Sequence, residues 1–207
     1  CSCDCKCAQQ RDSTIDPMAD PTYVFNATGW IVGDLFNMLP EFAQINLANP
    51  ESPQAQAYLW DLFDPQRNTY DSHKRLARYA MAALYYATSG MSWTEYTDWL
   101  SYSVSECDWF TKSSNTVCDP NLRPDNIDLH NNGLQGYIPE ELGLISNMWV
   151  LQLNQNEGLT GPLPTTIGMW KGASVIDVHG SGLTGTMPTE IGNLDAVADF
   201  FVMYNKI

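Results

Sequence analysis

An eleven-residue phrase that occurs twice constrains this chain more than any other feature. The phrase reads GLTGPLPTTIG from Gly158 and returns 24 residues later as GLTGTMPTEIG from Gly182, with three changes. A period near 24 residues is typical of architectures in which each repeat is one structural unit stacked on the next. The repetition therefore predicts stacked coils, in which the phrase is a structural turn used in each unit.

The same register extends over residues 126–207 and predicts a short strand at the start of each unit. The units begin at Asn126, Val150, Val175 and Asp199, and the second has one extra residue, Glu157 or Gly158. Residues at every second position of a strand share a face, so alternating apolar side chains should enter the core. These positions are Ile127 and Leu129, Leu151 and Leu153, Ile176 and Val178, and Phe200 and Val202.

Polar and turn-forming residues recur after each strand. An asparagine amide can satisfy backbone groups left unpaired as the chain turns, glycine permits unusual backbone angles, and proline fixes the outer segment. An apolar residue followed by glycine then returns the chain to the core. The four sets are Asn132, Asn156, Ser181 (a shorter substitute) and Asn205; Gly136, Gly161 and Gly185; Pro139, Pro164 and Pro188; and Leu142, Ile167 and Ile191.

The shared frame, LxLxxNxLxGxIPxxIGxL, resembles the plant-type leucine-rich repeat, a 24-residue class known from receptor-kinase ectodomains and from secreted proteins of plants and algae. The resemblance covers residues 126–207, as three full repeats and a truncated fourth. It implies an α/β solenoid, coiled in a right-handed sense, with a parallel sheet on its concave face. It also implies short strand or 3₁₀ structure on the convex side.

The residues before the repeats resemble the N-terminal cap of the same family. Trp99, a Cys-x-Trp start at Cys107 and Trp109, and a second cysteine at Cys118 carry this resemblance. It implies a Cys107–Cys118 disulfide, which requires an oxidising compartment. The separation of these cysteines departs from the usual pattern and implies a small insertion around residues 112–116.

Helical periodicity predicts a helical region ahead of the cap. Leu76, Ala80, Ala83, Leu84 and Ala87 share one face, with Gly90 as a stop signal. Ser52-Pro53 opens an earlier helix that Pro65 ends. A capping-box pattern, Ser92 to Glu95, predicts a short helix towards Trp99 and Leu100. Residues 28–48 are apolar enough for one or two further helices. The expected divisions are a cysteine-rich tail (1–22), a helical region (23–106), a cap (107–125) and repeats (126–207).

Composition and short motifs favour a secreted or cell-surface protein, with an oxidising organelle lumen as the alternative. The formal charge of −14 disfavours nucleic-acid binding, and the most apolar stretch, residues 79–87, is shorter than the ~20 residues of a membrane helix. Asn26 begins a possible N-glycosylation sequon. Cys1, Cys3, Cys5 and Cys7 are compatible with crosslinks, which we favour, or with metal-thiolate binding.

Catalytic and metal-binding interpretations have little support. Asp128 and His130, and likewise Asp177 and His179, should share a sheet face, but strands two apart lie about 10 Å from each other, too far for one shared metal ion. The HGSG sequence at His179 lacks the frame of a hydrolase nucleophile. A threonine array at residues 160, 165, 184 and 189 offers a small flat surface for ice or polysaccharide. We expect neither an enzyme nor a cofactor.

The outward residues of the predicted sheet are the candidate binding site for a protein or glycan. They combine polar and apolar side chains, a mixture typical of interfaces, and comprise Asp128, His130, Trp149, Gln152, Asn154, Asp177, His179, Phe201 and Met203. Phe201 and Met203 are equally well explained by packing against a further repeat. The leading hypothesis is a non-catalytic extracellular recognition or adhesion module. The alternative is a structural subunit of an extracellular or lumenal assembly, joined through the cysteine tail and the open repeat end.

Overall fold

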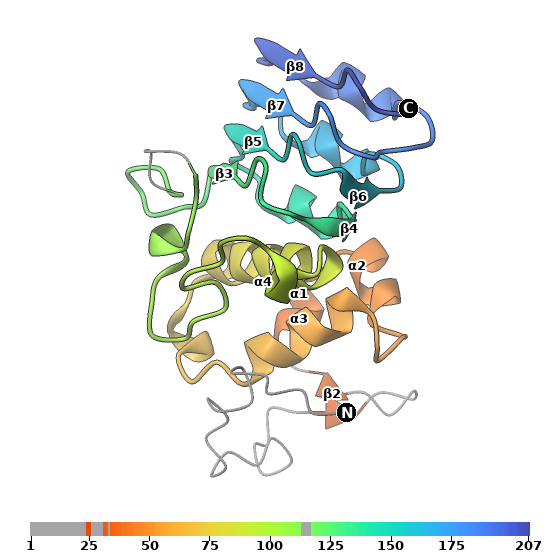
Figure 1. The fold of residues 1–207 in the computed structure, drawn as a ribbon. Coiled ribbons are helices and arrows are strands. Elements are labelled where there is room, and N and C mark those ends of the chain that lie inside the picture. Colours follow the sequence, from red (N-terminus) through yellow and green to blue (C-terminus); the bar gives the residue numbers. More distant parts are fainter. Residues whose placement is uncertain (1–23, 26–30, 33, 113–116) are drawn as a thin grey trace.

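The computed structural model describes residues 24–25, 31–32, 34–112 and 117–207. Within them, helices of the N-terminal half pack beneath a row of short parallel strands (Figure 1). The N-terminal elements are β1 Val24–Phe25, β2 Ile31–Val32, α1 Asp34–Met38, α2 Glu41–Asn46, α3 Pro53–Leu62, η3 Arg67–Thr69, α4 Ser72–Ala87, η4 Gly90–Ser92 and η5 Glu106–Asp108. The cysteine tail (Cys1, Cys3, Cys5, Cys7), the Asn26 sequon and residues 113–116 of the expected insertion lie outside the described residues.

The two long helices begin where their capping residues predict. Ser52 accepts a hydrogen bond from the Ala55 N–H at the start of α3, and Asp71 accepts one from the Lys74 N–H at the start of α4. Helix α4 is buried along most of its length because it lies between α3 and the first repeat (Figure 1). The residue with left-handed backbone conformation after α4 is Ser89, not the predicted stop residue Gly90. Gly90 has no side chain, and this leaves room for the Tyr85 ring.

Each repeat consists of a strand followed by an outer 3₁₀ helix. The strands β3 Asn126–Asp128, β5 Val150–Gln152, β7 Val175–Asp177 and β8 Asp199–Phe201 form one parallel sheet in that order. The outer helices are η6 Glu140–Leu144, η7 Thr165–Met169 and η8 Thr189–Asn193, which Pro139, Pro164 and Pro188 precede. Between strand and outer helix, β4 Gln135–Tyr137 and β6 Gly158–Thr160 form a second parallel pair.

The strand register confirms the alignment of the four units. Ile127 pairs with Leu151, Leu151 with Ile176, and Ile176 with Phe200. The first three of these side chains are almost completely buried, and Phe200 is partly buried against the same core. Alternation in the sequence therefore identifies the face of the sheet that enters the core.

Buried asparagines hold successive repeats together. The Asn156 amide donates hydrogen bonds to the carbonyls of Leu129, Leu153 and Asn154, and its Oδ1 accepts from the N–H groups of Asn132 and Leu134. Asn205 has the same role between the third and fourth repeats, where its side chain accepts from the Leu183 N–H and donates to the carbonyls of Val178 and Val202. At the equivalent position Ser181 makes a single hydrogen bond of 3.3 Å, to Leu153 O, as its shorter side chain predicts.

The first repeat joins the N-terminal half through similar asparagine contacts. The Asn132 side chain donates to Glu95 O and accepts from the Glu95 N–H, and the Thr94 N–H donates to Asn132 O. Gly136 allows the end of α4 to approach closely, because an added Cβ would lie 2.1 Å from Ala87 O. Helix α4 and the segment after it therefore cover the apolar end of the first repeat.

The short helix predicted from Ser92 towards Leu100 is wrong. Residues 97–100 form a turn in which Asp98 and Leu100 have positive φ angles of 64° and 61°. The Glu95 carboxylate accepts hydrogen bonds from Tyr96 and Thr97 instead of capping the chain at Ser92. The backbone of Glu95 is engaged with Asn132, so tertiary pairing outweighs the local capping pattern.

Buried ion pairs fix α4 to the segments around it. Arg78 is 2% exposed and contacts Asp64 at 3.0 Å and Glu106 at 2.9 Å, while its guanidinium lies 5.0 Å from the centre of the Trp60 ring. Arg75 pairs with Asp61 at 2.8 Å. Because removing one partner would leave an uncompensated buried charge, these pairs specify how α4 packs.

Replacing Asn156 with alanine should destabilise the fold by about 3 kcal/mol or more, because several buried backbone groups would lose their partners. Ser181→Ala removes one hydrogen bond and should cost about 1 kcal/mol. Urea denaturation of the two variants measures both free energies of unfolding. Equal losses would contradict the structural role given to Asn156.

The Glu95 carboxyl should titrate below the ordinary glutamate range. Hydrogen bonds from the Thr97 hydroxyl and the Thr97 N–H lower the pKa of Glu95. Because the folded-state pKa lies below the unfolded value, these bonds stabilise the fold above the unfolded pKa, and this contribution disappears as pH falls through the folded pKa. An NMR titration should show the pKa of Glu95 rising in Thr97→Val; an unchanged value would refute this account.

Candidate functional site

The outward face of the four-stranded sheet, on the side away from the core, carries three columns of side chains. The strand register forms two columns: Val150, Val175 and Asp199; and Asp128, Gln152, Asp177 and Phe201. Backbone hydrogen bonds continue the pairing beyond the strands and place His130, Asn154, His179 and Met203 in the third. Eight of the nine predicted site residues therefore come together on this face.

Two identical aspartate–histidine pairs occupy the first and third strands. Asp128 Oδ1 lies 2.7 Å from His130 Nδ1 and accepts the His130 backbone N–H, and Asp177 contacts His179 in the same way, also at 2.7 Å. The side chains of the two aspartates are only 6% and 10% exposed, whereas the histidine side chains are 40% and 28% exposed. This face therefore presents imidazole edges to solvent, with the carboxylates beneath.

The geometry of these pairs suits hydrogen bonding. Strand β5 separates the two pairs, which places them about 10 Å apart. Each carboxylate already accepts two hydrogen bonds from its own histidine. Among the described residues, no three His, Cys, Asp or Glu side chains form a group that could hold a metal ion. A neutral imidazole that donates from Nδ1 leaves Nε2 as an acceptor.

The exposed apolar residues of this face lie on and just after β8. Gln152 is half-buried and Asn154 is buried, whereas Phe201 is 38% and Met203 48% exposed. Tyr204, next in the chain, is 84% exposed at a positive φ of 61°. The largest exposed apolar side chains of the outward face therefore lie at its β8 end, beside the exposed Asp199.

Trp149 lies apart from the three columns. It precedes β5, and its N–H donates to Asp125 O at the edge where the strands begin. Alternation would place Trp149 on the core side, as it does Leu151, but the side chain is 53% exposed. Its aromatic surface is therefore available at the sheet edge.

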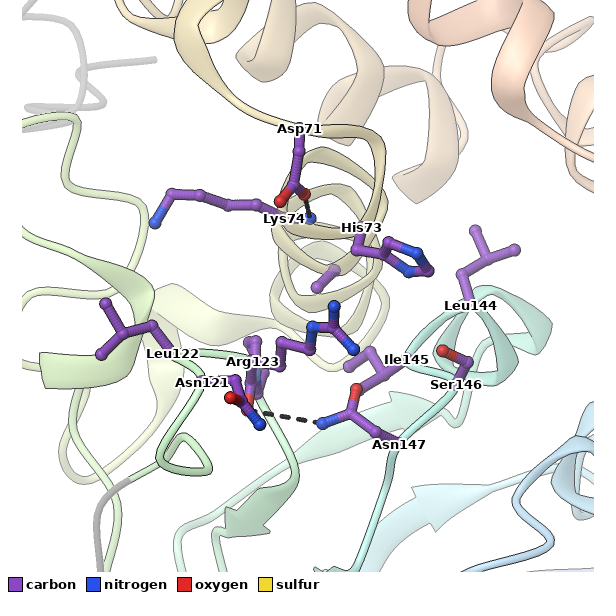
Figure 2. Close-up of a pocket in the computed structure, with 12 residues that line it drawn as sticks. Asp71, His73, Lys74, Asn121, Leu122, Arg123, Leu144, Ile145, Ser146 and Asn147 are labelled. Carbon is purple, nitrogen blue, oxygen red and sulfur yellow. Dashed lines mark hydrogen bonds between the residues drawn. The ribbon is translucent and has the colours of Figure 1, made fainter.

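A pocket near the start of the strands was not found from the sequence. It has a volume of about 270 Å³ and lies between the first turns of α4, the loop before β3 and the segment between η6 and β5 (Figure 2). His73, Arg123, Ser146 and Asn147 contribute polar groups to it. Because its lining comes from three distant segments, no local motif marks it.

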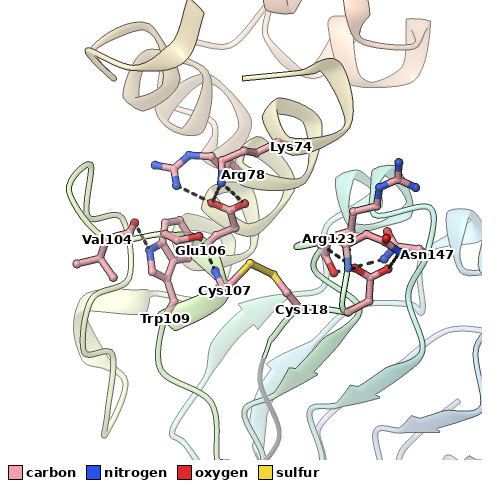
Figure 3. Close-up of a disulfide and its surroundings, with 12 residues drawn as sticks. Lys74, Arg78, Val104, Glu106, Cys107, Trp109, Cys118, Arg123 and Asn147 are labelled. Carbon is pink, nitrogen blue, oxygen red and sulfur yellow. Dashed lines mark hydrogen bonds and ion pairs between the residues drawn. A yellow bond between two sulfur atoms is a disulfide. The ribbon is translucent and has the colours of Figure 1, made fainter. Parts of the chain in front are cut away.

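The cap contains the disulfide that the family resemblance implied. Cys107, in η5, is bonded to Cys118 (Figure 3). Beside it, the completely buried Glu106 carboxylate accepts hydrogen bonds from Lys74 and Arg78 of α4. The disulfide closes the cap, and the ion pairs of Glu106, next to Cys107, join this segment to α4.

Comparison with known proteins matches this chain to solved structures. No protein-family model and no curated protein matches the sequence. The PEPR1–AtPEP1 crystal structure matches with a TM-score of 0.52 and 17% identity, over 62% of this chain and 18% of that chain. The leucine-rich-repeat ectodomain of the Arabidopsis thaliana receptor kinase GASSHO1/SCHENGEN3, in complex with CASPARIAN STRIP INTEGRITY FACTOR 2, matches with a TM-score of 0.39 and 30% identity. The match covers 40% of this chain and 10% of that chain. The plant peptide hormone receptor RGFR1, in complex with RGF2, matches with a TM-score of 0.38 and 32% identity, over 40% of this chain and 13% of that chain.

The likeness to the PEPR1–AtPEP1 structure, at 17% identity, shows a shared fold. The chain spans between 10% and 18% of the length of these receptor chains. Across the part of the chain that the structure describes, no helix is both long and apolar enough to cross a membrane.

His130 and His179, when neutral, should carry their proton on Nδ1, because that nitrogen faces a carboxylate in both pairs. The exposed His73, outside the sheet, is the control and should favour the Nε2 proton. Two-bond ¹H–¹⁵N NMR distinguishes the tautomers, and Asp128→Asn should change only His130. An Nε2-protonated ring at both positions would contradict the role of the aspartates as hydrogen-bond acceptors.

Proposed function

We propose that this chain is a non-catalytic extracellular recognition module that binds a protein partner. In this proposal residues 126–207 form a right-handed solenoid of 24-residue leucine-rich repeats, whose concave face is the outward face of the sheet. Residues 107–125 form its N-terminal cap and residues 23–106 a helical region that extends the cap. The disulfide supports an oxidising, extracellular location.

The observation that carries this proposal is a pair of exposed apolar side chains, Phe201 and Met203, on a face that also carries polar groups. Phe201 and Met203 remain 38% and 48% exposed next to Asp177 and His179 of the neighbouring strand, and Gln152 and His130 lie further along the same face. Burying such side chains against a partner contributes roughly 25 cal/mol per Å² of apolar area. The polar column beside them supplies direction and specificity through hydrogen bonds.

Binding explains this face better than catalysis does. Catalysis by a carboxylate requires an oxygen within reach of a substrate, but the side chains of Asp128 and Asp177 are 6% and 10% exposed and each is hydrogen-bonded to its own histidine. The two pairs are also about 10 Å apart, so they cannot act together on one bond. A rigid sheet with fixed side chains is well suited to selecting a partner.

Joint replacement of Gln152, Phe201 and Met203 with alanine should reduce partner capture at least tenfold, because it removes the exposed apolar contact area of Phe201 and Met203 together with a hydrogen-bonding side chain, and loss of a few anchor residues can cost about 2 kcal/mol or more. The measurement compares capture from an extracellular fraction by quantitative mass spectrometry. The matched control replaces Tyr137, Thr160 and Met169, exposed residues of the outer segments, and should leave capture unchanged. Equal capture by the sheet-face variant and the unmodified protein would reject this face as the binding site.

A further inference from the structure

The pocket near the start of β3 and β5 has the size of a small-molecule site. Its volume of about 270 Å³ is just below the ~300–1,000 Å³ typical of pockets for drug-sized ligands. Its walls are Asp71, His73, Lys74 and Ala77 of α4 and its cap, residues 121–124 before β3, and residues 144–147 at and after the end of η6. None of these residues belongs to the three columns of the outward sheet face.

Arg123, Lys74 and His73 line this pocket together with one carboxylate, Asp71, in a strongly acidic protein. Asp71 Oδ1 accepts the Lys74 N–H at the start of α4 and keeps its negative charge, and Lys74 Nζ is paired with Glu106 Oε1 at 2.8 Å. Arg123 contributes a guanidinium, and Figure 2 shows it turned towards the His73 ring. The chain as a whole has a formal charge of −14, so an exposed arginine and histidine facing one cavity favour an anionic group there.

The loop that presents Arg123 is held by its own backbone. Asp119 accepts hydrogen bonds from the N–H groups of Asn121 and Arg123, and the Asn121 amide also donates to it. Asn147 Nδ2 lies 3.5 Å from Arg123 O, a long contact that links the two walls (Figure 2). These contacts fix the backbone while the Arg123 side chain extends into the pocket.

The remaining lining combines uncharged hydrogen-bonding groups with apolar surface. Ser146, Asn147 and Asn121 supply a hydroxyl and two amides, and Leu122 and Leu144 supply apolar walls. Leu122 is 70% exposed, so a ligand that contacts it would cover apolar surface that now faces water. A small simple anion would use the arginine but neither the amides nor the leucines.

We propose that this pocket binds one carboxylated sugar unit, a hexuronate. The guanidinium of Arg123 matches a carboxylate through two parallel hydrogen bonds. The ring hydroxyls lie against Ser146 and the asparagine amides, and the apolar face of the sugar ring packs on the leucines. This site is separate from the sheet face and does not depend on the protein partner proposed above.

Isothermal titration calorimetry of the intact chain with glucuronate and galacturonate tests this proposal. At least one uronate should bind, while glucose, which lacks the carboxylate, and acetate and inorganic phosphate, which lack the ring, should bind at least tenfold more weakly. Arg123→Gln should weaken uronate binding at least tenfold. Lys171→Gln, which removes the same charge at an exposed position in the second repeat, should leave the affinity unchanged.

A second variant guards against loss of fold. Asn147→Asp places a negative charge in the pocket at nearly constant shape and should also weaken uronate binding at least tenfold, with an unchanged thermal midpoint. Failure of both uronates to bind, equal binding of glucose, acetate or phosphate, or an affinity unaffected by both pocket variants would overturn the proposal. Each of these results leaves partner capture by the sheet face unaffected.

Discussion

The covering of the first repeat by α4 is the constraint on which the rest of the structure depends. A stack of repeats exposes apolar side chains at its end unless another element buries them. Helix α4 lies against η6, and one continuous core runs from the helices through the repeats. The close approach requires Gly136, where an added Cβ would meet the backbone of Ala87. The register of the later repeats then follows from the first.

Polar groups determine how the covering element is oriented. Burial of apolar surface is non-directional, whereas Arg78 contacts Asp64 and Glu106 in fixed geometry while almost completely buried. Asn132 adds a second directional link, to Glu95. The Cys107–Cys118 disulfide then joins η5 to the segment that leads into β3. Hydrophobic burial therefore supplies affinity between the two halves, and these polar contacts specify their arrangement.

The same division between scaffold and recognition applies within the repeats. The buried Asn156 is fully engaged with backbone groups and has no capacity for a ligand. The outward positions vary from strand to strand and range from buried to exposed. In the aspartate–histidine pairs, the carboxylate orients the ring and the ring edge meets solvent. Positions that do not repeat are therefore the ones that can distinguish partners.

Local periodicity was sufficient to predict the repeats from the sequence. The alternation at Ile127 and Leu151 predicted both the strand register and the core, and the capping residues predicted where α3 and α4 begin, because these features depend on neighbours in the chain. The repeated phrase also predicted the outer turns. The likeness of the cap and repeats to leucine-rich-repeat proteins predicted the disulfide.

Tertiary structure alone decided the features that depend on distant pairing. Glu95 joins a turn rather than a helix because Asn132, far along the chain, engages its backbone. The burial of Asp128 and the exposure of Trp149 follow from packing that alternation does not describe. The pocket at Arg123 exists only where three segments meet. The sequence by itself determined the repeating scaffold because its signals are local and periodic. Only tertiary structure decided which side chains remain available for binding, because availability depends on what packs above each one.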